Sequence, residues 1–325
     1  LAPTIAAGMA GCSSGVKLDD GTEIRARFVV GADGLASTVA REVKAETWLD
    51  IPSDRFCYFS YFHCPEGLRH DLALFGFGDT PDKCGYIIFG TGNQQMLIGV
   101  FPANSELEAF KADPEGQFMA RLAAYPPIAP YLAGGQADRL FMRIKMPSFM
   151  RRSVGPGWAL VGDAGHFKDF VLSQGMCDAS NHALKLAPVI RQLLDDPSCE
   201  QAVLDAWERE RDLESIDVLF LSVQLSRAEG MGALATQLMD DAMNDPATRP
   251  LLGGIYERAH RPADLFNLKN MLRAAVGAVK NQRGSLDEVV GELEAGFAGQ
   301  MALGNAVEQI KNRPVRSWAL AKNAA

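Results

Sequence analysis

The 325-residue sequence has no surplus of basic charge, because 32 Lys and Arg stand against 40 Asp and Glu, for a net charge of −8. Nucleic acid is therefore not expected as a partner, since a chain of this charge repels phosphate. Long apolar runs are also missing: the cleanest, at 86–89 and 96–101, are strand-sized, whereas a bilayer-spanning helix needs roughly 20 residues. With 47% hydrophobic and 22% charged residues, the composition predicts a globular protein without an integral membrane segment.

Paired cysteine and histidine motifs are absent as well. The six cysteines form no C-x-x-C pair, which favours reduced thiols in a cytoplasmic protein over a disulfide framework. The five histidines form no H-E-x-x-H. The nearest group, Cys57, His63 and Cys64, fits no common zinc spacing, so we expect no metal site.

The dinucleotide fingerprint G-x-G-x-x-G does not occur in the sequence. The chain opens with Leu1 rather than methionine, and its first 15 residues show no signal-peptide features. We expect either a processed N-terminus or, as the motifs described below favour, a fragment whose beginning is missing.

The expected secondary structure changes along the chain. Residues 16–30 predict a hairpin with an Asp-Gly turn and a second arm that buries one face. Short aromatic and β-branched runs at 56–62, 72–77, 86–89 and 96–101 then predict an antiparallel sheet, with a helical insert near 106–124. A helix is predicted from Gln174 to the Asp-Asp-Pro stop at 195–197, and mostly helices follow from about residue 201, with breaks near 244–254 and 281–285.

Two strand–turn–helix junctions are the most informative features. The first, at 29–39, reads V-V-G-A-D-G-L-A-S-T-V, with Asp33 and Gly34 in the turn and Ser37 as the expected cap of a short helix over 38–43.

The second junction begins with the apolar run 158–161 and continues as G-D-A-G-H, with Gly162, Asp163 and Ala164 in the turn. Gly175 and Met176 stand at the start of the helix that follows. Glycine lets the backbone approach a ligand closely, and a helix N-terminus presents unpaired N–H groups that favour electron-rich ligand atoms. Since an aspartate there accepts hydrogen bonds from sugar-type hydroxyls, the two junctions together predict a nucleotide-type cofactor.

These residues resemble the FAD-dependent monooxygenases of the p-hydroxybenzoate hydroxylase fold and related flavin oxidoreductases. That family has a G-A-D-G-x-x-S-x-V-R stretch, matched from Gly31 to Val39, and a later G-D-A-(A/G)-H stretch, matched from Gly162 to His166. Asp33 and Asp163 lie 130 residues apart, an interval that a sheet-rich substrate domain fills in the family.

The resemblance implies an α/β fold in which an incomplete FAD-binding, Rossmann-like domain is split around an antiparallel β substrate domain and followed by a helical C-terminal tail. The expected divisions are 1–48 for the first part of the FAD-binding domain, 49–152 for the substrate domain, 153–200 for the second FAD-binding part and 201–325 for the helical region.

The resemblance also implies roles for the residues of both turns. Asp163, between Gly162 and Ala164, would hold the ribityl chain of FAD, and the backbone at Gly175 and Met176 would face the pyrimidine edge of the flavin. Asp33 and Gly34 would lie near the pyrophosphate and the route of the nicotinamide donor.

In that family NAD(P)H reduces the flavin, and dioxygen then serves to hydroxylate an activated, often aromatic, substrate. We therefore expect FAD as cofactor, NAD(P)H as transient co-substrate, dioxygen, and a small organic substrate. No catalytic residue can be assigned from the sequence.

Several alternatives stay open at this point. Phe170 and Ser173 replace a proline and a glycine beside the reactive part of the flavin, so a flavin-dependent reductase or halogenase on the same scaffold is an alternative. The W-x-W-x-I-P run that marks a halogenase is absent. Another alternative is a truncated, non-catalytic module that no longer retains FAD.

Individual side chains near the second turn also have two interpretations. His166 is expected to make a structural hydrogen bond rather than act as a base, and Cys177 to pack rather than react. The pair Lys168–Asp169 is interpreted either as functional or as simply solvated. The pair Arg151–Arg152 is interpreted as serving the nicotinamide phosphates or as surface charge.

Overall fold

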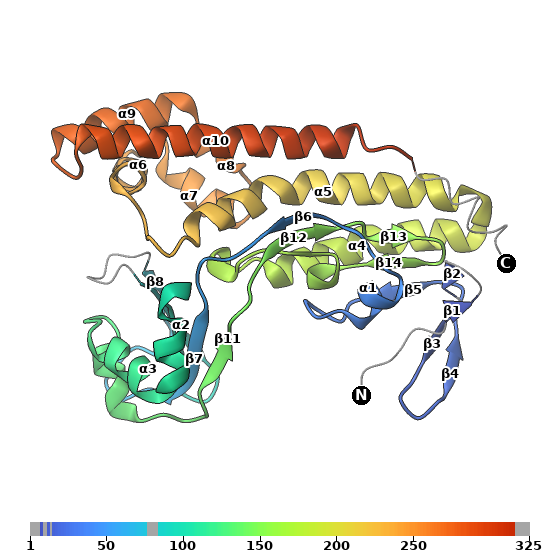
Figure 1. Cartoon of the computed structure of the whole chain (residues 1–325), viewed down its shortest axis with the longest axis horizontal. Helices are drawn as coiled ribbons and strands as arrows, with labels where there is room; N and C mark the ends of the chain where they lie inside the picture. Colours follow the sequence, from blue (N-terminus) through green and yellow to red (C-terminus); the bar gives the residue numbers. More distant parts are fainter. Residues whose placement is uncertain (1–6, 9–11, 14, 77–83, 316–325) are drawn as a thin grey trace.

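The computed structural model describes residues 7–8, 12–13, 15–76 and 84–315. It is a mixed α/β structure with small sheets and a large helical C-terminal region (Figure 1). The expected strand at 72–77 corresponds to β8 (Ala73–Gly76), and Phe77 lies outside the described residues. Among the described residues, no helix combines the length and apolar character needed to cross a membrane.

The N-terminal part forms two short hairpins. β1 (Ala7–Gly8) pairs with β2 (Cys12–Ser13), and β3 (Gly15–Lys17) pairs antiparallel with β4 (Glu23–Arg25). The second arm of the predicted hairpin was expected to continue to residue 30 with one face buried, and that expectation is wrong. Ile24 is 50% exposed, because the β3–β4 hairpin projects from the body of the molecule and the chain then enters a different sheet (Figure 1).

The predicted antiparallel sheet is confirmed. Five strands pair in the order β11-β7-β10-β9-β8, formed by β7 (Cys57–His63), β9 (Gly85–Thr91), β10 (Gln95–Phe101), β11 (Phe141–Arg143) and β8. Their aromatic and β-branched side chains suit a pleated surface with one buried face. On this buried face, Ile88 and Ile98 are completely buried, as is Met96.

The helical insert consists of two helices rather than one. η1 (Asn104–Glu106) leads into α2 (Leu107–Ala112), and α3 (Pro114–Ala123) begins after Asp113, whose side chain accepts a hydrogen bond from the Gly116 N–H. The helix divides there because a proline is favoured in a first helical turn and is disruptive inside a helix. Phe110 of α2 covers the sheet by packing edge-on against Phe56 at 5.2 Å. η2 (Ala129–Gly134) follows.

A three-stranded sheet of order β13-β14-β5 carries both junctions. It contains β13 (Val154–Gly155), β14 (Trp158–Leu160) and β5 (Val29–Gly31). A second sheet of order β15-β12-β6 contains β6 (Thr47–Ile51), β12 (Ser148–Arg151) and β15 (His166–Phe167). β6 and β12 run as an antiparallel pair that leads from the five-stranded sheet toward the rest of the molecule (Figure 1). The exact domain divisions expected from the sequence stay a prediction.

The C-terminal region is helical, as predicted. After α4 (Gly175–Asp195) and η5 (Pro197–Cys199), it contains α5 (Glu200–Leu225), α6 (Ala233–Asn244), α7 (Arg249–Tyr256), α8 (Pro262–Leu265), α9 (Leu268–Lys280) and α10 (Leu286–Lys311). α5 packs against both α4 and α10 (Figure 1). The break expected at 244–254 is partly filled by α7, whereas the break at 281–285 is confirmed.

Candidate functional site

The two junctions are brought together by parallel pairing of β5 with β14. Val30 lies opposite Ala159, and the Val161 N–H donates to the Gly31 carbonyl at 2.9 Å. Both turns therefore leave the carboxyl ends of adjacent parallel strands, the edge at which open α/β sheets bind ligands.

The first turn is organised by Asp33, which caps α1 (Thr38–Glu42). Its carboxylate accepts hydrogen bonds from Ser37 Oγ at 2.5 Å and from the Thr38 and Val39 N–H groups at 2.7 and 3.0 Å. Ser37 Oγ accepts in turn from the Ala40 N–H at 2.8 Å, so the predicted helix cap is confirmed. Gly34 takes a positive φ of +75°, which an L side chain rarely adopts.

The second turn, η3 (Gly162–Ala164), lies directly on α4. The Gly162 N–H donates to His182 Nδ1 at 3.2 Å, and a Cβ added at Gly162 would stand 3.0 Å from the Cβ of Ala179. Gly162 also has a positive φ of +57°, so both its conformation and its contact with α4 favour glycine. Ala164 is completely buried beside it.

Asp163 lies beside the first residue of α4. The site of a Cβ on Gly175 would be 3.7 Å from Asp163 Oδ1, and Met176 is 83% exposed. Burial raises the pKa of Asp163 above its ordinary value, an effect opposed by the positive charge of Lys168. The structure therefore places Asp163, Gly175 and Met176 at one edge.

The N-terminus of α4 has donors available for a ligand. The first N–H groups of a helix have no acceptor within the helix. Gln174 precedes α4, and among the described residues its side chain makes no capping hydrogen bond. Its Nε2 donates instead to the carbonyls of Ile255 and Tyr256 at 3.2 and 3.1 Å. This edge therefore presents a carboxylate and uncapped N–H groups, which suit a ligand with hydroxyls and electron-rich atoms.

Arg151 connects the two turns. Its Nη1 donates to the Ala164 carbonyl at 2.9 Å, and its guanidinium stacks 4.2 Å from the centroid of the Phe149 ring. Burial lowers the pKa of Arg151, while the charge of Asp33 acts in the opposite direction. Arg151 is thus hydrogen-bonded to the second turn and is also influenced by the charge of Asp33 in the first turn.

A basic cavity of 270 Å³ lies beside the first turn, where Leu35 and Ala36 form part of its wall. Arg143, Lys145 and Arg151 line it against a single acid, Asp50. The sequence analysis missed Arg143 and Lys145. The available signal was the alternation of basic and apolar residues in F-M-R-I-K-M, which places both bases on one side of an extended chain.

A buried cluster of charge lies behind the second turn, centred on Asp178. Its carboxylate is in contact with Lys168 Nζ and with a guanidinium nitrogen of Arg258, while His166 Nε2 is 3.5 Å away. Burial lowers the pKa of Lys168, and Asp163 opposes that shift. The interpretation of Lys168–Asp169 as a solvated pair is wrong, because Lys168 and Asp169 are only 6 and 2% exposed and bind different partners.

His166 does not form the hydrogen bond expected of it. Among the described residues, neither of its ring nitrogens has a hydrogen-bond partner, and its ring packs against that of His182 with 5.3 Å between centroids. Burial is the main reason that the pKa of His166 lies well below its ordinary value, so the buried ring is neutral.

The exposure and the partners of the remaining side chains decide between their two interpretations. Arg152 is buried and its Nε donates to Glu208 at 2.9 Å, so its interpretation as surface charge is wrong. Asp169 pairs with Arg55, whose Nη2 lies 2.7 Å from Asp169 Oδ1. Cys177 was expected to pack, but its position in the first turn of α4 leaves it exposed.

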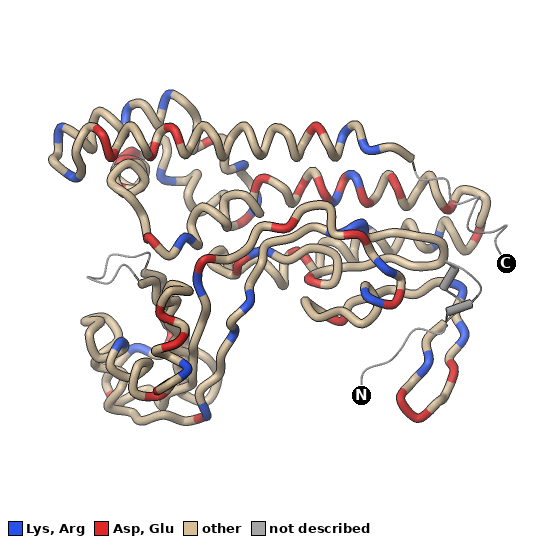
Figure 2. Tube along the Cα trace, in the orientation of Figure 1, with Lys and Arg blue, Asp and Glu red and all other residues tan. Residues whose placement is uncertain are grey.

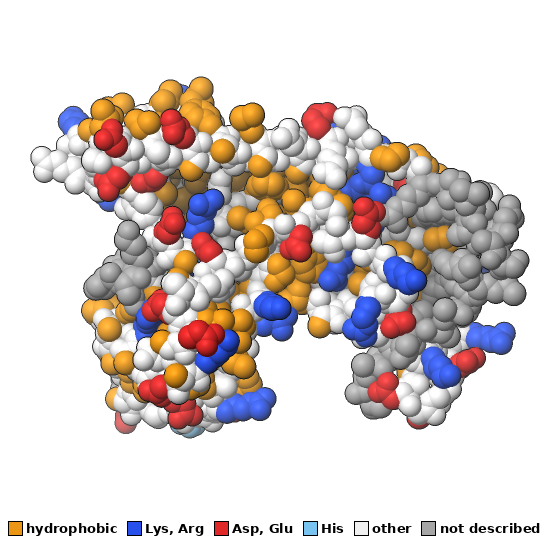
Figure 3. Space-filling model, viewed as in Figure 1, with side chains coloured by type: hydrophobic (Ala, Val, Ile, Leu, Met, Phe, Trp, Pro, Cys, Tyr) orange, Lys and Arg blue, Asp and Glu red, His pale blue; other side chains and the backbone are white. Residues whose placement is uncertain are grey.

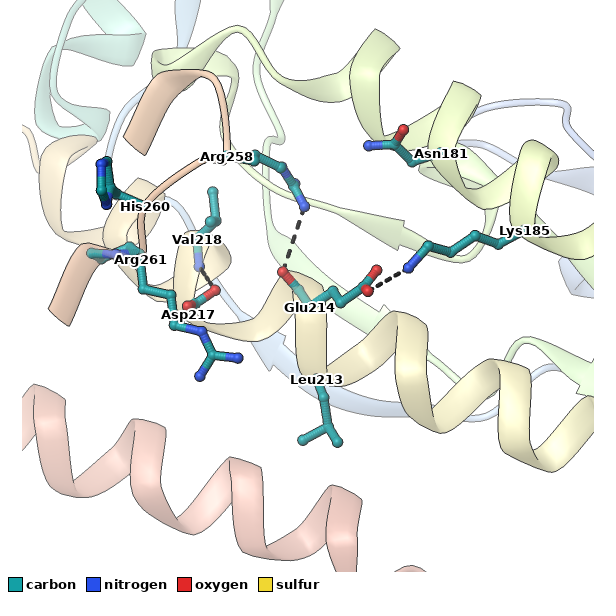
Figure 4. A pocket seen from close by; sticks show the side chains of 10 residues that line it. Asn181, Lys185, Leu213, Glu214, Asp217, Val218, Arg258, His260 and Arg261 are labelled. Carbon is teal, nitrogen blue, oxygen red and sulfur yellow. Dashed lines mark hydrogen bonds and ion pairs between the residues drawn. The ribbon is translucent and has the colours of Figure 1, made fainter. Parts of the chain in front are cut away.

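Arg258 links the helical region to this cluster, because it follows α7 and contacts Asp178. Arg258 also lines a second cavity, of 370 Å³ (Figure 4). In this cavity Lys185 pairs with Glu214, whose carbonyl accepts from Arg258 Nη1 at 3.5 Å (Figure 4). Arg258 has a positive φ of +60°, a conformation uncommon outside glycine. The sequence offered no signal for this contact, since Arg258 and Asp178 are 80 residues apart.

Comparison with known proteins identifies the fold. No protein-family profile and no curated protein sequence matches the chain. Among solved structures, the chain is similar to the myxobacterial chondrochloren halogenase CndH, described as a variant of FAD-dependent halogenases, with a TM-score of 0.56 and 21% identity over 76% of this chain and 63% of that one. It is also similar to PqsL of Pseudomonas aeruginosa, described as a probable FAD-dependent monooxygenase, with a TM-score of 0.55 and 20% identity over 77% and 66%.

A third similar structure is the flavin-dependent brominase Bmp2, with a TM-score of 0.62 and 14% identity over 86% of this chain and 70% of that one. The chain thus spans just under two thirds of the length of CndH and PqsL. Together these likenesses show that the chain has the p-hydroxybenzoate hydroxylase-type fold of FAD-dependent monooxygenases and halogenases.

Proposed function

We propose that this chain belongs to an FAD-dependent oxidoreductase of the monooxygenase type, which uses NAD(P)H and dioxygen to hydroxylate a small organic substrate. The observation that carries the proposal is the placement of Asp163 beside Gly175, at an α4 N-terminus without a side-chain cap. When bound there, FAD supplies the redox chemistry, which none of the side chains at this edge provides.

The residues of the site fit the cofactor in two ways. The Asp163 carboxylate can accept hydrogen bonds from ribityl hydroxyls, and glycine at position 175 leaves room for a ligand next to it. The exposed first turn of α4, with Met176 outermost, offers N–H groups and the positive end of the helix dipole to the pyrimidine edge.

The proposal also gives a role to the basic side chains near the first turn. Arg151 lies between the two turns, and Arg143 and Lys145 add positive charge to the cavity beside Leu35. Arginine and lysine side chains form strong, charge-assisted hydrogen bonds with phosphate oxygens. We assign these three residues to the phosphates of FAD or of the nicotinamide donor, while both oxygens of Asp33 serve the cap of α1.

The halogenase alternative has structural neighbours in its favour, since CndH and Bmp2 are described as a halogenase and a brominase. The W-x-W-x-I-P run is nevertheless absent from the sequence. Substrate-stimulated NADPH oxidation with oxygen uptake and a hydroxylated product supports the monooxygenase. A product that forms only with added chloride or bromide supports the halogenase.

The test of the site is a titration of the purified chain with FAD, followed by flavin fluorescence. Asp163→Ala should weaken binding about 10- to 100-fold, because a hydrogen bond to a charged group contributes about 1.5–3 kcal/mol. Asp195→Ala, at the exposed far end of the same helix, is the matched control and should bind FAD like the unaltered chain.

Equal FAD affinity in the Asp163→Ala variant and the unaltered chain would refute the assigned role of Asp163. An unaltered chain that does not bind FAD in this titration, and is colourless once free FAD has been removed, would favour the non-catalytic module.

A further inference from the structure

α9 and α10 lie side by side at the outer surface of the helical region (Figure 1). Both leave large apolar side chains exposed, and hydrophobic side chains gather on this part of the surface (Figure 3). On α9, Leu268, Leu272 and Val276 are 55, 48 and 70% exposed; on α10, Val290, Phe297 and Met301 are 42, 43 and 71% exposed. Spacings of four and seven residues place each set on one side of its helix. These six side chains are called the outer face below.

The opposite sides of the same helices are already packed. Ala274 and Ala278 of α9 and Val289 of α10 belong to one buried cluster, and a Cβ added at Gly296 would stand 2.7 Å from Met271 Cε. α10 is thus apolar on its inner and outer sides, and residues 295–307 contain no charged side chain. Apolar stripes of a helix are normally covered, and only the inner stripe of α10 is covered within the described part of the chain, so the outer face calls for a partner.

The charges beside the outer face are sorted between the two helices (Figure 2). α9 carries exposed Lys269 and Lys280 and no acidic residue, whereas the first half of α10 carries exposed Asp287 and Glu294 and no basic residue. These four side chains form no ion pair within the described part of the chain. A surface that carries both positive and negative charges is poorly suited to bind an anionic membrane, because such a membrane attracts basic residues and repels acidic ones.

We propose that the outer face is an interface between two copies of this chain. A two-fold axis parallel to the helices places α9 of each copy on α10 of the other, which buries both apolar sets at once. Lys280 ends α9 and Asp287 stands in the first turn of α10, so the two residues lie at the same end of the helix pair. The same axis therefore brings each Lys280 to the partner's Asp287, so the interface contains two symmetry-related pairs of opposite charge.

The first test is sedimentation of the full chain across the micromolar range. The expected species has twice the 35.2-kDa mass of the chain. Phe297→Glu should give a monomer, because it places a charge in the apolar centre of the interface. Met142→Glu is the matched control: Met142 is 59% exposed on β11, in the five-stranded sheet, and its replacement should leave the dimer intact.

The second test uses charge reversal in separate chains. Lys280→Glu and Asp287→Lys should each weaken self-association at least tenfold, because each homodimer would contain two like-charged contacts. An equimolar mixture should regain the dimer, since both contacts in the mixed pair again join opposite charges. Recovery on mixing also shows that both variants fold.

Three outcomes would overturn the proposal. The first is an unaltered chain that stays monomeric over the whole range, including one that instead sediments with phosphatidylglycerol vesicles. The second is a dimer that Phe297→Glu leaves intact, because the contact must then use another surface. The third is a mixture of the two charge variants that dissociates as readily as either variant alone.

Discussion

At the scale of single residues, the surroundings of the two turns give different roles to residues of the same type. Asp163 is half-buried and available to a ligand, whereas both oxygens of Asp33 are bound by the first turn of α1. His166 and His182 are both buried and uncharged, and His182 uses its neutral Nδ1 to accept the Gly162 N–H. The neutral state of His182 is therefore the one that its hydrogen bond with Gly162 requires.

The buried histidines predict a loss of stability in acid. Burial, aided by the charge of Arg211, lowers the pKa of His182 to about 2 in the folded chain, against 6.5 for an unhindered histidine. Below pH 6.5 the unfolded chain therefore takes up a proton that the folded chain cannot. The free energy of unfolding should fall by about 1.4 kcal/mol per pH unit for each such histidine.

The measurement is urea unfolding between pH 7.5 and pH 4.5, roughly the span over which an ordinary histidine becomes charged. His182→Gln keeps an acceptor for Gly162 and should reduce the pH slope by about one proton. His63→Gln, at an exposed position on β7, is the matched control for replacing a histidine by glutamine. An unaltered slope in His182→Gln would show that this ring is charged in the folded state.

At the scale of secondary-structure elements, the helix ends decide where the site forms. α1 begins where Asp33 and Ser37 can cap it, and α4 begins after Gln174 without a side-chain cap. The first N–H groups of α1 already donate to the Asp33 carboxylate, whereas the first N–H groups of α4 have no side-chain acceptor among the described residues. Of these two helices, only α4 can therefore offer its N-terminal donors to a ligand.

Removing the cap of α1 should destabilise the first turn. We expect Asp33→Ala to lower the free energy of unfolding by about 1–2 kcal/mol, because it removes acceptors from Ser37, Thr38 and Val39. Asp33→Asn retains an acceptor oxygen and should cost less than half as much. Chemical denaturation of the three proteins measures this; equal losses for both variants would mean that charge, not capping, is the contribution of Asp33.

At the scale of the whole molecule, buried ion pairs join parts that are distant in the sequence. Arg152 and Arg313 both contact Glu208 and so connect the segment after β12, α5 and the segment after α10. Arg55, before β7, pairs with Asp169 in the loop that leads to α4, and its guanidinium also stacks 4.5 Å from the Phe101 ring centroid. The five-stranded sheet is thereby linked to the candidate flavin site.

Breaking this link should affect the molecule globally. Arg55→Met leaves Asp169 as an unpaired buried charge and should cost about 3–5 kcal/mol of unfolding free energy. Combining it with Asp169→Asn removes that charge while an oxygen can still accept the Val171 N–H, so the double variant should recover part of the loss. Thermal and urea unfolding provide the comparison; a double variant less stable than Arg55→Met would contradict this account.

The sequence alone determined the local features: the cap of α1 at Ser37, the end of α4 before Pro197, the strand segments of the antiparallel sheet, and the two strand–turn–helix junctions that resemble a flavin site. Each depends on residues close together in the chain, where turn chemistry and side-chain periodicity act directly.

Only the tertiary structure decided the partners of Lys168, Arg152 and Arg151 and the exposure of Ile24 and Cys177. Burial and ion pairing depend on which distant elements pack together, as when Arg258 reaches Asp178 across 80 residues. A local sequence pattern determines the helix, strand or turn that carries a side chain. The exposure of that side chain to solvent and the charges around it depend on the rest of the folded chain, and these two factors set its pKa and its ion pairs.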